Sequence, residues 1–200
     1  FFASSCSSKK DILFIQDYAE LTQHEIIFKE ILIKPDDILR VRISSQNPEL
    51  SQFYSFNESL SNNTIESYQI SGYLVNSEGF ISLPLLGSIF VKDFTLYRAS
   101  NMIKNLLKDK GLLLNASVDI KIVNSYFTVL GEVNRPGRYN FLQNNMDILQ
   151  ALGIAGDLTI NGKRGDIKII RKTDNEMSVN TIDLTSIELL NSDNFQVFPN

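Results

Sequence analysis

Few residues of this 200-residue chain could do chemistry. Its one cysteine, Cys6, lies in a polar N-terminal tail, where nothing would activate the thiol as a nucleophile. Its one histidine, His24, has no nucleophile that the sequence pairs with it. A structural zinc site made of Cys and His needs four ligands, and one residue of each type cannot supply them. The sequence therefore predicts no metal site of this kind.

The adjacent carboxylates Asp36 and Asp37 could suggest a glycosidase acid or a metal ligand. Neighbouring residues on a strand point to opposite faces, so these two side chains would not converge on one bond. We interpret them as turn residues. The later glycines are not followed by the Lys-Ser/Thr pair that a phosphate-binding loop requires. We therefore expect no catalytic residue and no cofactor, and an enzyme is disfavoured.

Composition and charge further narrow the classes of protein to which this chain could belong. Hydrophobic residues make up 43% and charged residues 21%, which predicts a packed core. The net charge of -4 argues against nucleic acid as a partner, because nucleic-acid binders usually have a basic face. No stretch approaches the roughly 20 apolar residues of a spanning helix.

Residues 1–11 read Phe-Phe-Ala-Ser-Ser-Cys-Ser-Ser-Lys-Lys-Asp. Bulky apolar residues followed by small ones are typical of the end of a signal peptide. In bacterial lipoproteins, cleavage falls just before a cysteine that is then lipidated, although Ala3 stands where Leu is usual. The alternative is an unmodified thiol in a frayed terminus. Because the first residue is Phe, we expect an N-terminus that has been processed or shortened.

The next part of the chain alternates like a half-buried strand. Residues 38–43 place Leu39, Val41 and Ile43 on one face, and residues 34–37 precede them as a turn. We interpret the outward-facing arginines of this strand as part of a solvent-exposed face rather than as an anion-binding site. Residues 44–67 are rich in Ser, Asn and Gln and predict a long loop. Its aromatic residues would either stack on a sugar ring or anchor the loop: Phe53, Tyr54 and Phe56.

Residues 68–91 predict short strands with a hairpin turn. Gly79 supplies the positive φ of a tight turn, and Pro84 should lie at a strand end because it cannot donate to a ladder. Residues 85–91 are expected to continue in extended conformation. A helix should begin after the N-cap Thr95 and stop at Gly111, with an apolar stripe facing the core. Another strand is expected at 117–123.

A second unit is expected from residue 126. It is predicted to run strand (127–133), turn (134–137), strand (138–142), helix (146–155) and strands near 166–171 and 179–184. Asp147 would complement the helix dipole, and Gly156 would end the helix. Pro136 fixes φ and Gly137 frees it, so we expect Gly137→Val to destabilise this unit. The order hairpin, helix, strands is that of a β-grasp.

Three segments together resemble the outer-membrane polysaccharide export proteins of Gram-negative bacteria. The first is Ile33–Val41, where the family commonly has Gly in place of Asp36. The second is Tyr73–Gly87, with its Leu-Pro-x-x-Gly element, followed by the helix at Thr95. The third is Val129–Tyr139 with its continuation Ile148–Thr159, which resembles the opening of a soluble-ligand-binding β-grasp (SLBB) domain. The overall character of the sequence is similar to that of the Bacteroidetes branch of this family.

The resemblance implies an α+β chain with a signal-peptide remnant, lipobox and tether as a spacer (1–26), a polysaccharide export domain (27–125) and a soluble-ligand-binding β-grasp domain (126–200). It also implies a lipidated Cys6, a ring-shaped homo-oligomer and contact with an inner-membrane co-polymerase. The protein would lie at the periplasmic face of the outer membrane and serve as a passive conduit for the exported polysaccharide. The motif residues to which the resemblance gives structural roles are Pro35, Asp36, Asp37, Gly79, Pro84, Gly87, Gly131, Glu132, Pro136 and Gly137.

Family members usually carry a membrane-inserting C-terminal segment, which this sequence lacks, so we expect either a shortened chain or the lipid as the only anchor. Two other classes stay open. One is a β-grasp module that binds a small soluble ligand. The other is a structural envelope ring of the secretin type, which would carry a protein cargo rather than a glycan.

Overall fold

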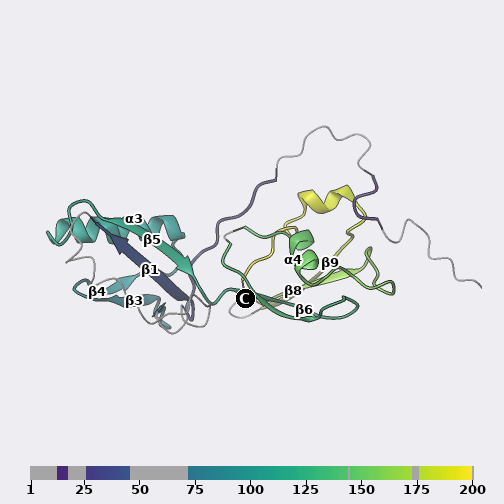
Figure 1. Cartoon of the computed structure of the whole chain (residues 1–200), viewed down its shortest axis with the longest axis horizontal. Coiled ribbons are helices and arrows are strands. Elements are labelled where there is room, and N and C mark those ends of the chain that lie inside the picture. The colour runs from purple at the N-terminus through teal and green to yellow at the C-terminus, as the bar shows by residue number, and fades with distance from the viewer. Residues whose placement is uncertain (1–12, 18–25, 46–71, 144, 173–175, 200) are drawn as a thin grey trace, which may run out of the picture. The chain divides into compact units, whose positions relative to one another are not determined.

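The computed structural model describes residues 13–17, 26–45, 72–143, 145–172 and 176–199 (Figure 1). The chain forms two compact units. The N-terminal unit contains Glu30–Ser125 with 140–144, and the C-terminal unit contains Phe1–Lys29, Tyr126–Tyr139 and Asn145–Asn200. Each has one α-helix and several short strands among its described residues, which confirms the predicted α+β class.

A three-stranded antiparallel sheet forms the base of the N-terminal unit. Strand β1 (Ile38–Ser44) lies between β2 (Tyr73–Leu74) and β5 (Ser117–Ile122). The register pairs Leu39 with Ile122 and Val41 with Ile120, so apolar side chains of both strands share one face. The alternation in the sequence therefore placed the correct face of β1 in the core, and Val41 is only 6% exposed.

Strands β3 (Phe80–Leu83) and β4 (Gly87–Phe90) form an antiparallel hairpin. The prediction that residues 85–91 are extended throughout is wrong at its start. Leu85 has a φ of 61° and lies in the turn, as does Leu86, whose N–H donates to the Pro84 carbonyl (2.7 Å). The chain must reverse directly after Leu83, and this tight turn uses the residues that the apolar pattern assigned to a strand.

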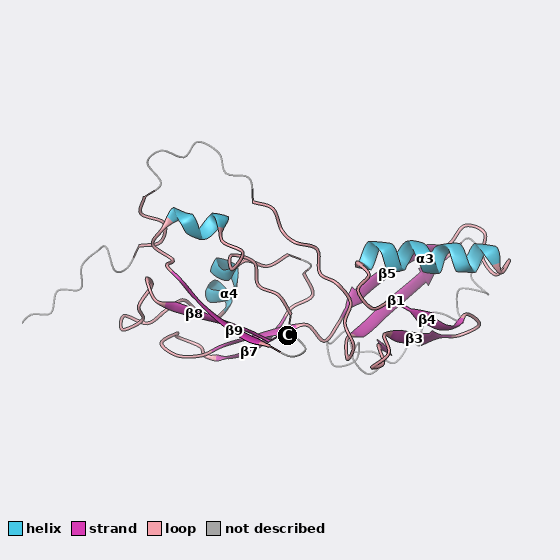
Figure 2. Cartoon of the chain, turned by 180° about the vertical axis from the view of Figure 1, so that it is seen from behind, coloured by secondary structure: helices cyan, strands magenta, loops and turns pink. Residues whose placement is uncertain are grey.

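Helix α3 (Leu96–Asp109) packs along β5 (Figure 2). The Thr95 hydroxyl accepts the backbone N–H of Arg98, and Gly111, with a φ of 66°, follows the end of the helix, as predicted. The helix buries its stripe against the sheet, and the fully buried side chains of this core include Ala99, Ile103, Leu107, Ile33, Leu39, Val75 and Val91.

The C-terminal unit begins with two short strands, β6 (Tyr126–Val129) and β7 (Gly137–Asn140). Both are shorter than predicted, and β6 ends just before Gly131, whose φ of 95° departs from the extended conformation. Val133 then pairs with Leu158 in an isolated bridge instead of continuing the hairpin ladder. Helix α4 (Ile148–Ile154), strands β8 (Ile167–Lys172) and β9 (Met177–Ile182) and the 3₁₀ helix η4 (Ile187–Asn191) complete the unit.

Helix α4 begins with a capping box. The Asp147 carboxylate accepts the backbone N–H of Gln150 (2.8 Å), and the Gln150 side chain accepts the backbone N–H of Asp147 (3.2 Å). Asp147 was predicted to act through the helix dipole, but its contact is this direct hydrogen bond. The core beneath the helix contains Val133, Leu152, Ala155, Leu158, Ile182, Leu184, Leu189 and Phe195.

Residues from the start of the chain pack on the C-terminal unit. The Ile15 and Gln16 N–H groups donate to the carbonyls of residues 184 and 185 (3.1 and 2.7 Å). The Asp17 carboxylate accepts the backbone N–H of Ile187 (2.6 Å). Further along, Lys29 exchanges two hydrogen bonds with the Gln196 side chain. Residues 13–17, which the sequence suggested as part of a spacer, therefore belong to the fold.

Candidate functional sites

The turn before β1 has Pro35 and Asp36 at its two central positions. Asp36 has a φ of 69°, in the left-handed region, and the N–H of Asp37 closes the turn on the Lys34 carbonyl (3.2 Å). A Pro followed by a residue with positive φ is a type II turn, in which Gly is preferred at the second position. This conformation agrees with the Gly that the resemblance leads us to expect at this position.

Asn124 fixes this turn to the end of β5. Its side-chain oxygen accepts the N–H of Ile38 (2.9 Å), and its amide nitrogen donates to the Asp36 carbonyl (2.8 Å). The Asp36 N–H also donates to the Val75 carbonyl (2.9 Å). The sequence analysis missed Asn124, because its partners lie 86 to 88 positions away in the chain.

Burial raises the pKa of Asp37 to about 6. The Lys34 backbone N–H, which donates to this carboxylate (2.7 Å), and the Lys34 charge oppose the shift, whereas Asp36 adds a small repulsion in the same direction as burial. Asp36 and Asp37 thus have different roles in one turn. One provides a backbone conformation and the other a partly buried side chain that caps the turn.

The hairpin that follows β2 depends on Gly79. Its φ is 89°, as predicted, and its carbonyl accepts the N–H groups of Val91 and Lys92 (2.8 and 3.1 Å). A side chain at this position would begin 2.4 Å from the Lys92 Cβ, so only Gly fits. Pro84 directly follows β3 and Gly87, with a φ of 80°, opens β4, so both lie at strand ends.

The outer face of this hairpin carries a chain of aromatic contacts. The rings of Phe80 and Phe90 lie edge to face at 5.2 Å, and those of Phe90 and Phe94 do so at 5.9 Å. The Arg98 guanidinium carbon lies 3.9 Å from the centre of the Phe94 ring. We call Phe80, Phe90, Phe94 and Arg98 the aromatic strip. Alternation with the buried Ile81 and Ile89 could have shown that Phe80 and Phe90 face outward.

The motif of residues 131–139 is bonded to the loop after α4. Glu132 contacts Thr159 twice, since its carbonyl accepts the Thr159 N–H (2.9 Å) and its carboxylate accepts the hydroxyl (2.7 Å). The Asn134 and Arg135 N–H groups donate to the carbonyls of residues 157 and 155 (3.0 and 2.9 Å). The motif residues therefore join the β6–β7 connection to the end of the helix.

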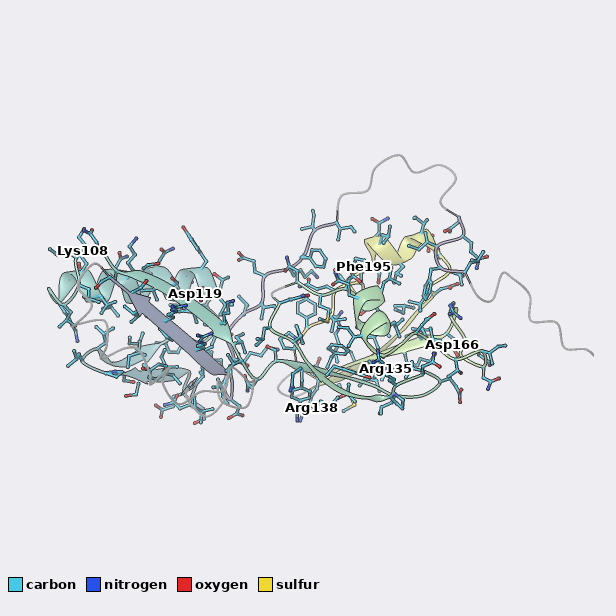
Figure 3. The ribbon with its side chains drawn as sticks, viewed as in Figure 1. Lys108, Asp119, Arg135, Arg138, Asp166 and Phe195 are labelled. Carbon is cyan, nitrogen blue, oxygen red and sulfur yellow. The ribbon has the colours of Figure 1, made fainter. Side chains whose placement is uncertain are left out.

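Pro136 is exposed, and Gly137 opens β7. The argument that Gly137 is needed for its free φ is wrong. Its φ is not positive, and a side chain at this position would meet nothing within 4 Å. The positive φ of this motif lies at Gly131 instead. In the same hairpin, the Arg138 guanidinium lies 3.5 Å from the centre of the Tyr126 ring (Figure 3).

A buried arginine holds the loop after α4. Arg164 is 7% exposed and its guanidinium donates to the Asp157 carboxylate at 2.8 Å. Asp157 has a φ of 66°, so its backbone also departs from helical geometry at the point where the helix ends. The ring of Phe14 lies 4.9 Å from the same guanidinium. No local pattern in the sequence marks Arg164 as a buried residue.

The remaining predicted residues lie outside the described part of the chain: Cys6, Phe53, Tyr54 and Phe56. Within the described residues, no group of three or more His, Cys, Asp or Glu side chains is arranged to hold a metal ion. None of the described helices is long and apolar enough to span a bilayer.

The comparisons with known proteins agree with these motifs. The family model described as polysaccharide biosynthesis/export protein matches residues 28–123, and the model of the SLBB domain matches residues 126–180. A search of curated proteins finds no match. An export domain followed by an SLBB domain defines the class of polysaccharide export proteins. This chain belongs to that family, as the three segments predicted.

Proposed function

We propose that this protein is a subunit of a passive conduit that carries capsular or exopolysaccharide through the periplasm to the outer membrane. The observation that carries the proposal is the order of the two domains on one chain, an export domain before an SLBB domain. The domain bounds that we propose are 27–125 and 126–200. The chain would need neither nucleotide nor cofactor, because synthesis elsewhere pushes the polymer forward.

The motif residues support this proposal through what they contact. Asp36, Gly79 and Glu132 fix turns and connections through backbone hydrogen bonds. Such contacts fix the conformation of these loops, and a repeating assembly requires surfaces of fixed conformation. We propose a closed homo-oligomeric ring with head-to-tail interfaces, which contacts an inner-membrane co-polymerase. A lipid on Cys6 would hold each subunit at the outer membrane, and the Bacteroidetes branch stays a prediction.

The test is deletion of the gene in the producing organism, with surface glycan measured by extraction and sugar analysis. We expect surface glycan to be lost and to return when the full chain is supplied from a plasmid. Normal surface glycan in the deletion strain would refute the proposal. Loss of a surface protein with intact glycan would favour a structural ring instead.

A further inference from the structure

The aromatic strip is a continuous aromatic surface that remains in contact with solvent. Phe90, its central ring, is 41% exposed although it contacts two other aromatic side chains. Single exposed apolar residues are common, but a contiguous group of large apolar side chains marks a binding surface. Phe80 and Phe90 lie on the face of β3 and β4 opposite the buried Ile81 and Ile89, whereas Phe94 also packs with one side against the core of the N-terminal unit.

Two cations flank these rings. Arg98 lies over Phe94, and Lys92 starts beside Phe90, because the Lys92 Cβ and the Phe90 Cε2 both lie within 3.0 Å of the Cβ position at Gly79. Glu78 and Asp93 are near in sequence. Among the described residues, however, no carboxylate forms an ion pair with Lys92 or Arg98. Their charges are available to an anion from outside the chain.

The next pair along the hairpin adds hydroxyl groups. Ser82 and Ser88 are opposite each other, exposed, and on the same face as the pair Phe80–Phe90. A sugar unit has apolar C–H faces and a rim of hydroxyl groups. A protein surface with aromatic rings beside hydroxyl groups therefore fits a sugar better than it fits a lipid chain. The two cations then favour a sugar that carries a carboxylate, because guanidinium groups bind carboxylates with paired hydrogen bonds.

We propose that the aromatic strip, together with Lys92, Ser82 and Ser88, binds an anionic segment of the exported polysaccharide. The rings contact the C–H faces of the sugars, and Arg98 and Lys92 bind carboxylates of uronic-acid units. This inference rests on the proposed function and adds to it a class of substrate, an acidic glycan, and a surface that holds it.

The first test is titration of the full-length purified protein with a short oligogalacturonate and with a neutral malto-oligosaccharide of the same length. We expect the acidic oligomer to bind at least about tenfold more tightly, with an affinity that falls as salt rises. Phe90→Ala and Arg98→Gln should each weaken that binding by about tenfold. Equal affinity for both oligomers, or no detectable binding of either, would overturn the inference.

Matched controls are available on helix α3. Tyr97 is an aromatic residue that is 76% exposed outside the strip, and Lys104 is an exposed cation. Tyr97→Ala and Lys104→Gln should bind the oligogalacturonate like the unmodified chain. Phe90→Tyr keeps the ring and should retain binding, and an unchanged melting temperature of Phe90→Ala would show that its loss of binding is not a folding defect. A change in sedimentation of Phe90→Ala, with unchanged sugar binding, would assign the strip to contact with another copy.

A second test separates this inference from the proposed function. The deletion strain is complemented with the double variant Phe90→Ala/Arg98→Gln, and surface glycan is compared with that of the unmodified gene. We expect several-fold less glycan. Full glycan from the double variant, in a strain where deletion abolishes it, would overturn the inference alone. Normal glycan in the deletion strain would instead refute the proposed function.

Discussion

At the scale of single residues, Asp36 adopts a backbone conformation that side chains disfavour. Its φ of 69° is tolerated by Asp better than by most residues, but Gly adopts it without steric cost. We therefore expect Asp36→Gly to stabilise the N-terminal unit by about 0.5–1 kcal/mol and raise its melting temperature by about 2–8 °C. Asp36→Ala should lower it. Calorimetry of both variants checks the prediction, and a lower melting temperature for Asp36→Gly would contradict it.

Asp37 should make stability depend on pH. Because burial raises its pKa to about 6 in the folded protein, the folded state holds this proton more tightly than the unfolded chain does. Its contribution is fully present below the ordinary pKa of an aspartate and is lost as the pH rises through about 6. The free energy of unfolding should therefore decrease from about pH 4 to about pH 7, as denaturant titration would show. Asp37→Asn should remove that part of the decrease, and an identical pH profile in both proteins would exclude this role.

The two glycines of the β6–β7 connection should differ. Gly131 has a φ of 95°, so Gly131→Ala should cost about 1–2 kcal/mol. Gly137 has an ordinary φ and open space around its Cβ position, so Gly137→Ala should change stability by less than about 0.5 kcal/mol. Denaturant unfolding of both variants measures the difference. Equal losses of stability in the two variants would mean that the place of these glycines in the β6–β7 connection, and not the φ, determines the free-energy cost.

At the scale of elements, the capping box should contribute measurably to the C-terminal unit. Asp147→Ala removes the acceptor for the Gln150 N–H and should cost about 1 kcal/mol. Gln150→Glu keeps an acceptor for the Asp147 N–H, so it should cost much less. The midpoint of denaturant unfolding reports both changes. Equal stability of Asp147→Ala and the unmodified protein would show that packing alone holds α4.

The elements that the sequence predicted are those with a local signal. The alternation of residues 38–43, the N-cap Thr95 and the positive φ of Gly79 each follow from a few neighbouring residues, and all three were correct. What the sequence could not show depends on residues far apart. Asn124 lies 86 positions from Ile38, and Val133 pairs with the distant Leu158 instead of extending β6.

The candidate sites also divide into residues with a local signal, which could be predicted, and residues that depend on distant partners, which could not. The positions of Pro35 and Pro84 in turns could be predicted, because turn residues have local preferences. The ion pair of the buried Arg164 with Asp157 could not, since a Gly-Lys-Arg sequence is normally an exposed turn. Only part of the aromatic strip could be predicted from the sequence. Phe80 and Phe90 alternate outward along their strands, but Phe94 joins them from the connection that leads into α3.

At the scale of the whole molecule, the proposed lipid on Cys6 has a direct test. Cys6→Ala expressed with its own signal sequence should move the protein from the outer-membrane fraction to the soluble periplasmic fraction. Ser8→Ala is a matched control, because it alters the same segment and leaves the thiol. Immunoblots of the separated fractions give the measurement. Retention of Cys6→Ala in the outer membrane would show that another part of the protein is the anchor.

The hydrogen bonds of Ile15, Gln16 and Asp17 to the C-terminal unit set a limit on reach. Only seven peptide steps separate Cys6 from Leu13, where the described segment begins, and a fully extended chain covers at most about 25 Å over that span. An acyl chain on Cys6 would therefore hold Leu13, and with it the part of the C-terminal unit that residues 15–17 contact, within that distance of the bilayer surface. The length of this segment would thus limit how far the C-terminal unit can move away from the membrane.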